Sequence, residues 1–247
     1  MTSEAPNSLL SREEVEDYQD KGYLLYRDQL LSDKELDELA AIYDEHRAAR
    51  PDKRGDEFDT PHFEDQRLMA FLLAPPVLDL VECVLGPSFL LWSSHFICKE
   101  PRVGRATPWH RDADYWSGRA DRYDQIVTVW LALDDVDRAN GCMQVIPRSH
   151  LMTDFAGYRP VDRDTNTFSS EIVDLDTSTA VAFELRRGQC SLHDARMAHG
   201  AEPNSSPRRR LGYTMRYIST ETTLVPERNV GHRTWVARSG APRTEEG

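Results

Sequence analysis

The sequence predicts a mainly β protein, a sandwich or barrel of short strands that carries helices supplied by the N-terminal part of the chain. Its 247 residues suit one large domain or two small ones. Helix signals are concentrated before about residue 85. From Gly86 onward, short segments rich in β-branched and aromatic residues are separated by turn residues. Many short strands with frequent turns are typical of all-β sandwiches and barrels.

Two capping boxes predict the first helices. Ser11 is followed three residues later by Glu14, and Ser32 is followed in the same way by Glu35. In such pairs the serine and the acidic side chain each satisfy a backbone N–H at the start of a helix. The other elements of this part are an apolar edge strand at 22–26, a polar loop at 50–62 and a helical segment at 64–85 that is interrupted or restarted at Pro75-Pro76.

The β part follows. Strands are predicted at 87–100, 125–134, 141–146, 179–185, 190–194 and 209–219. The polar stretch 153–176 is long for a plain connection, and segments of that length often form lids or binding loops. We therefore expect a single domain over 1–247, with a helical part at about 1–85, a β core at about 86–219 and a C-terminal extension at 220–247.

Composition excludes several classes of partner. The formal net charge of −12 would repel nucleic-acid phosphates. No apolar run approaches the roughly 20 residues of a membrane span, and the polar start of the chain lacks the apolar segment of a signal peptide. The four cysteines form no CxxC pair. We expect a cytoplasmic protein with reduced cysteines.

The chemistry is concentrated around His110 and Asp112. In extended backbone, residues i and i+2 point to the same side, so these two side chains would converge. A metal site would need a third ligand from another histidine, for example His193 or His199. Two histidines and a carboxylate form the facial triad of non-haem iron oxygenases, which leaves open positions on the metal. Eleven residues after His199, Arg210 could grip a dicarboxylate through its planar guanidinium.

The ordered motifs resemble those of the phytanoyl-CoA dioxygenase family. They are His110-x-Asp112, then Asp134–Asp135 leading through NGCMQVIPRSH to His150, then His199-Gly200, then Arg210. The N-terminal DKGYLL and the closing RRLGYTMRY extend the resemblance over most of the chain. The nearest subgroup is bacterial and acts in specialised metabolism, including antibiotic biosynthesis, or in small-molecule catabolism.

The resemblance implies a double-stranded β-helix (a jelly-roll, cupin-like core) flanked by N-terminal helices. It also implies an iron(II)- and 2-oxoglutarate-dependent dioxygenase that consumes O2 and releases succinate and CO2, with ascorbate as a supporting reductant. His110, Asp112 and His199 would hold iron, and Arg210 would hold the distal carboxylate of 2-oxoglutarate. Ala201 stands where the family often has serine, so one hydrogen bond to the cosubstrate is expected to be missing. Related halogenases have a small residue in place of Asp112, so hydroxylation is expected rather than halogenation.

Strand parity and position suggest further site residues. Lys99, Thr128 and Trp130 are candidates for contact with the cosubstrate. Tyr115 and Trp116 are candidates for an aromatic wall beside the metal, although residues of this kind often serve packing alone. Arg216 shares strand parity with Arg210 and is a candidate for a substrate anion, or alternatively for a salt bridge at the end of the barrel. The pocket walls are expected from residues 50–65, 113–124, 151–178 and the segment after 219.

Two other functions remain open at this point. The first is a cupin-like metalloenzyme without oxygen chemistry. The second is a non-catalytic protein that binds 2-oxoglutarate or metal as a sensor. The expected partner is a small-molecule substrate, anionic or bound to a carrier, and the expected assembly is a monomer or a homodimer.

Overall fold

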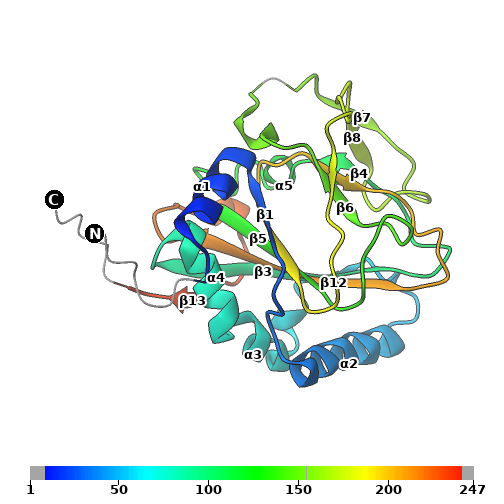
Figure 1. Ribbon diagram of the computed structural model, residues 1–247, viewed down its shortest axis with the longest axis horizontal. Coiled ribbons are helices and arrows are strands. Elements are labelled where there is room, and N and C mark those ends of the chain that lie inside the picture. The colour runs from blue at the N-terminus through cyan, green and yellow to red at the C-terminus, as the bar shows by residue number, and fades with distance from the viewer. Residues whose placement is uncertain (1–8, 154, 241–247) are drawn as a thin grey trace.

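A large antiparallel sheet runs through the middle of the molecule (Figure 1). The computed structural model describes residues 9–153 and 155–240. The strand order of this sheet is β1-β10-β5-β12-β3-β13, and β2 also pairs with β3. Its strands are β1 Tyr23–Tyr26, β2 Phe58–Asp59, β3 Phe89–Lys99, β5 Ile126–Ala132, β10 Cys190–Asp194, β12 Arg210–Ser219 and β13 Trp235–Arg238.

A smaller sheet has the strand order β4-β11-β6-β9. Its strands are β4 Thr107–His110, β6 Met143–Val145, β9 Val181–Ala182 and β11 His199–Ala201. The chain passes repeatedly between the two sheets, and a cavity lined by both lies between them. A separate hairpin is formed by β7 Tyr158–Pro160 and β8 Ser170–Ile172. This arrangement confirms the predicted mainly β core of jelly-roll type.

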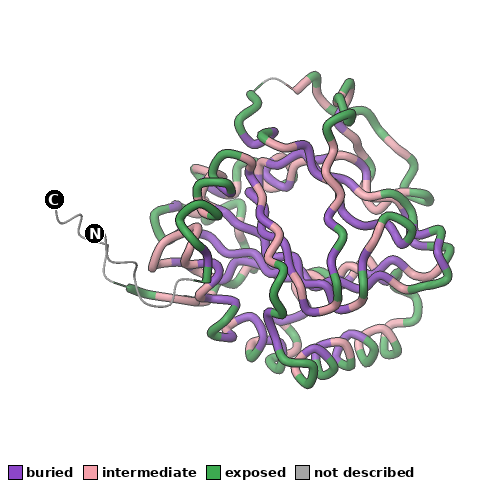
Figure 2. The backbone as a smooth tube through the Cα atoms, viewed as in Figure 1, coloured by how far each residue is buried: buried purple, intermediate pink, exposed green. Residues whose placement is uncertain are grey.

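Helices from the N-terminal part cover the outer face of the large sheet. They are α1 Arg12–Lys21, α2 Asp33–Ala49, α3 Met69–Leu72 and α4 Pro75–Leu85. Both predicted capping boxes are present, at Ser11 for α1 and at Ser32 for α2. Their buried apolar side chains join those of the strands in one hydrophobic cluster. Figure 2 shows the result, with buried backbone in the sheets and exposed backbone along the outer side of α2.

Strand β12 has both faces buried over its whole length. Leu211, Tyr213, Met215 and Tyr217 pack in the cluster beneath the helices. The alternate residues point the other way, because successive side chains of a strand lie on opposite faces. Of these, Arg210, Thr214 and Arg216 line the cavity between the sheets. One strand thus supports the hydrophobic core and carries polar side chains into the cavity.

Gly212 lies between Arg210 and Thr214 on the cavity face of β12, and the ring of Trp130 lies across it. A Cβ atom at Gly212 would come within 2.1 Å of Cζ2 of Trp130. Only glycine leaves room for the indole at this place. The indole of Trp130 can therefore pack over Gly212, and the guanidinium carbon of Arg210 is 5.4 Å from the centroid of the Trp130 ring.

Three local expectations need adjustment. The segment predicted as a strand at 179–185 is a strand only at Val181–Ala182, because its partner β6 is itself only three residues long. The C-terminal extension contributes β13 to the edge of the large sheet, and its residues 241–247 lie outside the described part. The short helices that sequence did not predict are α5 Asp112–Tyr115, η1 Pro61–Phe63, η3 Ser149–Leu151 and η4 Pro226–Arg228, whereas η2 Gln66–Leu68 lies within the predicted helical segment 64–85.

Within residues 9–153 and 155–240, no single helix combines the length and the apolar character needed to cross a membrane. The bent pair Gln66–Leu72 and Pro75–Leu85 meets that criterion only when the two helices are taken together.

Candidate metal centre

Three potential ligands meet at one end of the cavity. His110 is the last residue of β4, and His199 is the first residue of β11. These two residues are direct partners across the antiparallel pair, which brings their ring centroids to 4.1 Å. Asp112 begins the short helix α5, and its Oδ1 lies 3.5 Å from Nε2 of His110 and 4.0 Å from Nε2 of His199.

The predicted convergence of His110 and Asp112 therefore holds, but Asp112 is not on a strand. Arg111 between them keeps extended dihedral angles (φ −116°, ψ 133°), so the two neighbouring side chains still fall on one side. The side chain of Arg111 turns away from the site. It pairs with Asp114 and lies 4.0 Å from the ring centroid of Phe155.

Backbone carbonyls orient both imidazoles. Nδ1 of His110 donates to the carbonyl of Pro108 at 2.8 Å, and Nδ1 of His199 donates to the carbonyl of Met197 at 3.0 Å. With the proton on Nδ1, each Nε2 presents a lone pair towards Asp112. Three electron-pair donors at these distances repel one another unless a cation lies among them. This tautomer is the one that a metal ligand needs, with the second nitrogen held by a carbonyl.

The charges of the cluster also suit a cation. Burial and the neighbouring His110 lower the pKa of His199 well below its usual value, so this imidazole is neutral. Burial tends to raise the pKa of Asp112, but Arg216 and the histidines hold it below its usual range. Two imidazoles and one carboxylate match the donor set preferred by non-haem iron(II), and among the described residues no fourth histidine, cysteine or carboxylate joins the group.

His193 lies beside this cluster without belonging to it. Its ring centroid is 5.0 Å from that of His199, and it lines the cavity from β10. Among the described residues, the group that can share one ion contains only His110, Asp112 and His199. Burial lowers the pKa of His193 to about 4, so it is neutral near pH 7.

Arg210 lines the same cavity. Its side chain is almost fully buried, and its Nε has no hydrogen-bond partner among the described residues. Burial lowers the pKa of Arg210 to about 10, which still leaves the guanidinium charged near neutral pH. Thr128 and Trp130 line the cavity as their strand parity predicted, and the hydroxyl of Thr128 is also buried without a partner. Ala201 lines the cavity too and offers no hydroxyl.

Lys99 is not brought into the cavity. It lies directly opposite Arg210 in the pairing of β3 with β12, which is the face that sequence predicted. Its Nζ, however, donates to the carbonyls of Ala201, at 3.1 Å, and of Glu202. These bonds hold the ammonium against the end of β11, and Lys99 is absent from the cavity lining.

A second chamber adjoins the metal site, and we call it the aromatic chamber. It has a volume of about 290 Å³ and shares Asp112, Arg216, His95 and Phe168 with the first cavity. Its other lining residues are Asp59, Thr60, Trp92, Ser93, Tyr115, Trp116, Arg119 and His232. Tyr115 and Trp116, predicted as an aromatic wall, both lie here.

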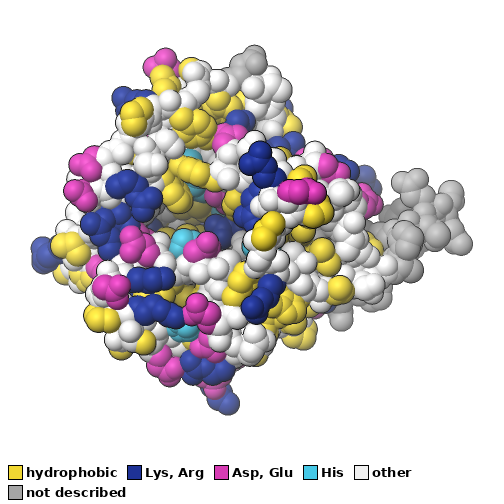
Figure 3. Space-filling model, turned by 180° about the vertical axis from the view of Figure 1, so that it is seen from behind, with side chains coloured by type: hydrophobic (Ala, Val, Ile, Leu, Met, Phe, Trp, Pro, Cys, Tyr) yellow, Lys and Arg dark blue, Asp and Glu magenta, His cyan; other side chains and the backbone are white. Residues whose placement is uncertain are grey.

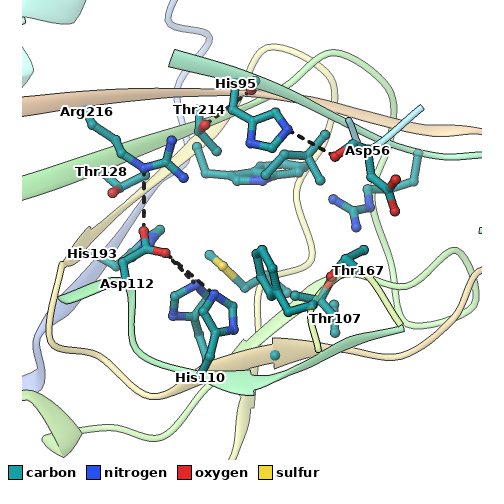
Figure 4. A pocket seen from close by; sticks show the side chains of 18 residues that line it. Asp56, His95, Thr107, His110, Asp112, Thr128, Thr167, His193, Thr214 and Arg216 are labelled. Carbon is teal, nitrogen blue, oxygen red and sulfur yellow. Dashed lines mark hydrogen bonds and ion pairs between the residues drawn. The ribbon is translucent and has the colours of Figure 1, made fainter. Parts of the chain in front are cut away.

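Two guanidinium groups lie against the tryptophans of the aromatic chamber. Trp92 and Trp116 meet edge to face with 4.5 Å between ring centroids. The guanidinium carbon of Arg216 is 5.2 Å from the centroid of Trp116, and that of Arg119 is 5.1 Å from the centroid of Trp92. Arg216 also approaches Asp112, with Nε 3.5 Å from Oδ2, as Figure 4 shows.

The loop 161–169 between β7 and β8 closes one side of the cavity. Phe168 packs against His110 with 4.7 Å between ring centroids, and Thr167 lines the cavity beside it. Arg105 fixes this loop through bonds to the carbonyls of Arg163, at 2.8 Å, and Asn166, at 3.0 Å.

The same guanidinium is paired with Asp56. Its Nη2 is 2.6 Å from Oδ1 and its Nε is 3.2 Å from Oδ2 of this carboxylate, and both side chains are buried. Asp56 itself borders the cavity (Figure 4). Arg105 therefore joins the loop that follows α2 to the loop that carries Phe168.

Sequence reasoning missed several residues of the two chambers. Thr214 could have been predicted from the sequence, because it shares the strand parity of Arg210 and Arg216 on β12. Asp56, Thr167, Phe168 and Arg119 come from loops, where no periodicity indicates a direction. On the outside, Figure 3 shows basic, acidic and histidine side chains interspersed around a hollow in the face seen from behind.

Comparison with known proteins adds an independent finding. A model of the family described as phytanoyl-CoA dioxygenase (PhyH) matches residues 18–212. The peroxisomal phytanoyl-CoA dioxygenase of Mus musculus is 29% identical over 167 residues, which cover 66% of this chain and 49% of that protein. The chain thus spans about half the length of the curated relatives it matches.

Solved structures resemble the fold over most of the chain. The non-heme monooxygenase ThoJ, in its apo form, gives a TM-score of 0.75 with 27% identity and covers 92% of this chain and 84% of its own. The non-heme alpha ketoglutarate dependent carbocyclase SnoK from nogalamycin biosynthesis gives a TM-score of 0.73 with 24% identity and covers 90% of each chain. At that identity the likeness to SnoK concerns the fold alone.

Proposed function

The chain belongs to the phytanoyl-CoA dioxygenase family, and from that premise we propose that it is an iron(II)- and 2-oxoglutarate-dependent oxygenase acting on a small organic substrate. The observation that carries the proposal is the buried group His110, Asp112 and His199, with both Nε2 atoms turned to the carboxylate. Arg210, whose Nε has no hydrogen-bond partner in the described part of the chain, lines the same cavity.

In this proposal the three residues hold the iron, and the carbonyls of Pro108 and Met197 keep the imidazoles in the required tautomer. Bound iron and 2-oxoglutarate supply the oxidising chemistry, in which O2 is consumed and succinate and CO2 are released. The protein contributes position and a buried environment. Phe168 from the loop 161–169 shields His110 from water.

Arg210 would bind the distal carboxylate of 2-oxoglutarate. A planar guanidinium can form two parallel hydrogen bonds to a carboxylate, and in a buried cavity such a charge-assisted pair is strong. The hydroxyl of Thr128 supplies a further donor, and the indole of Trp130 closes the side of the cavity over Gly212. Lys99, which is bound to backbone carbonyls, has no role in this proposal.

The substrate would occupy the aromatic chamber next to Asp112. Tyr115 and Trp116 provide part of its walls, and Arg216 lies at the boundary between the two chambers. We propose hydroxylation as the default oxidation, because Asp112 fills the position that a halide would need. The proposal places the reaction in small-molecule or specialised metabolism.

The test is succinate release with Fe(II), 2-oxoglutarate and ascorbate, measured against a panel of small organic acids, amino acids and carrier-bound acyl groups. Succinate formation with stoichiometric O2 uptake in response to one member supports the proposal. Turnover of a substrate without O2 or 2-oxoglutarate would instead indicate a cupin-like metalloenzyme. Tight 2-oxoglutarate binding without succinate under any condition would indicate a sensor. An Asp112→Ala variant serves as the control for adventitious iron chemistry.

A further inference from the structure

The aromatic chamber contains buried hydrogen-bond donors that the protein leaves without acceptors. Nε1 of Trp92 is buried and has no hydrogen-bond partner among the described residues, and Nε of Arg216 is buried with no hydrogen bond there beyond its 3.5 Å ion-pair contact with Oδ2 of Asp112. The side chains of Arg216 and Trp92 are 8% and 1% exposed, respectively. A buried N–H without an acceptor carries an uncompensated desolvation cost, so a ligand that supplies an acceptor here gains from satisfying it.

The charges in the chamber favour an anion. Among the carboxylates of the described residues, Arg216 pairs with Asp112 alone, whose charge would be shared with a metal ion, and its Nη1 donates to the hydroxyl of Ser93 at 3.5 Å. Arg119 forms no ion pair with a carboxylate within the described ranges, and its Nε donates to the side-chain oxygen of Asn229 at 3.0 Å. Apart from Asp112, the carboxylate in the lining is Asp59, whose side chain is 68% exposed to water and therefore well screened.

The walls of the chamber favour a flat or apolar body. Trp92 and Trp116 meet at right angles, and Tyr115 and Phe168 lie at the side towards His110 with 4.9 Å between their ring centroids. Aromatic walls of this kind gain from offset or edge-to-face contacts with an unsaturated ligand. Each guanidinium lies over a tryptophan ring, a contact that consumes no N–H donor.

We propose, on the basis of the function proposed above, that the substrate is a small unsaturated or aromatic carboxylic acid whose carboxylate is held by Arg119 and Arg216 in the aromatic chamber. The carboxylate accepts hydrogen bonds from the two guanidinium groups, neither of which forms a close ion pair with a carboxylate other than Asp112 among the described residues. Its apolar body lies between the tryptophans and Phe168, beside Asp112. A cationic ligand would be repelled by both guanidinium groups, and a neutral amide would bring donors to a place that already has an excess of them.

The experiment compares matched probes that differ in charge. Phenylacetate and cinnamate are set against phenylacetamide and cinnamamide, with phenethylamine as the cationic member. Binding is measured by saturation-transfer NMR and calorimetric titration to protein loaded with Ni(II) and saturated with 2-oxoglutarate. Nickel prevents turnover, and the saturating cosubstrate prevents the acids from competing for Arg210.

We expect the acids to bind about tenfold to a hundredfold more tightly than their amides, which is the range for a hydrogen bond to a charged group. Arg119→Gln should reduce acid binding to the level of the amides, and Arg119→Lys should restore part of it. Arg122→Gln is the matched control, because Arg122 lies in the same loop, pairs with Asp124 and does not line the chamber. It should leave all affinities unchanged.

Equal binding of acids and amides, preferential binding of phenethylamine, or no binding of any probe would overturn the proposal. Full acid affinity in Arg119→Gln would also overturn it. The comparison of probes on the unmodified protein needs no variant, so it stands even if a variant fails to fold. Titration of Ni(II) and 2-oxoglutarate without probes is a separate measurement. If Ni(II) or 2-oxoglutarate does not bind in that titration, the result counts against the proposed function. The affinity ratio of acids to amides tests only the preference of the aromatic chamber for an anion.

Discussion

The buried pair of Arg105 and Asp56 allows a quantitative prediction about the loop 161–169. Arg105→Gln would leave the carboxylate of Asp56, whose side chain is 6% exposed, without the guanidinium that neutralises it. Removing one partner of a buried ion pair typically costs about 3–5 kcal/mol, because the remaining charge is desolvated and uncompensated. We expect a loss of unfolding free energy of that size.

The assay is urea unfolding followed by tryptophan fluorescence, with the midpoint and the slope compared between variants. Asp56→Asn alone should cost about 1–3 kcal/mol, because Arg105 keeps its bonds to the carbonyls of Arg163 and Asn166. The double variant should be more stable than Arg105→Gln, since it contains no isolated carboxylate. The control is Arg122→Gln, which removes an exposed ion pair with Asp124. This variant should leave the midpoint of urea unfolding unchanged.

Two results would refute this reasoning. One is a cost below about 1 kcal/mol for Arg105→Gln, a value typical of an exposed ion pair. The other is strict additivity, with the double variant as unstable as the sum of the two single variants within about 0.5 kcal/mol. A parallel measurement is the rate of tryptic cleavage after Arg163, which should rise in Arg105→Gln because the loop loses its anchor.

Three further predictions concern the metal and the cosubstrate. Asp112→Ala should weaken Fe(II) binding beyond the roughly 10–100-fold typical of losing a residue that only orients a ligand; unchanged metal titration would remove Asp112 from the ligand set. Arg210→Ala should raise the 2-oxoglutarate KM about tenfold to a hundredfold with far less effect on Fe(II) affinity, and equal changes in both constants would contradict its assigned role. Gly212→Ala should cost about 1–3 kcal/mol in urea unfolding and should weaken 2-oxoglutarate binding, because its Cβ would displace Trp130; a variant with wild-type stability and affinity would show that the indole moves freely.

The sequence was informative where backbone geometry is regular. The motif around His110 and Asp112 placed two of the three potential ligands, and the alternation of β12 placed Arg210 and Arg216 on one face. Parity also put Lys99 on the correct face of β3. It could not show that the carbonyls of Ala201 and Glu202, from the other sheet, would hold the ammonium away from the cavity.

Loops were the limit of that reasoning. The segment 153–176 was expected to form a lid or binding segment, and its Phe168 does reach the metal cluster. Nothing in the local pattern indicated which side chain of this segment would contact His110. The path of the loop depends on Arg105, which binds the carbonyl of Arg163 from 58 residues earlier in the chain. The same holds for Asp56 and Arg119, whose positions follow from contacts between segments that are distant in sequence.

The double burial of β12 has a consequence for how members of such a family can diverge. One face of this strand is fixed by helix packing and the other by the polar residues that line the cavity, so nearly every substitution on it disturbs either folding or one of these polar residues. Tyr115, Trp116 and Arg119 stand outside this constraint, on a connecting segment that contributes little to the main core. Substrate preference can therefore change by exchange of such segments while the inherited scaffold stays intact, and descendants of one ancestor can acquire new selectivity at little cost in stability.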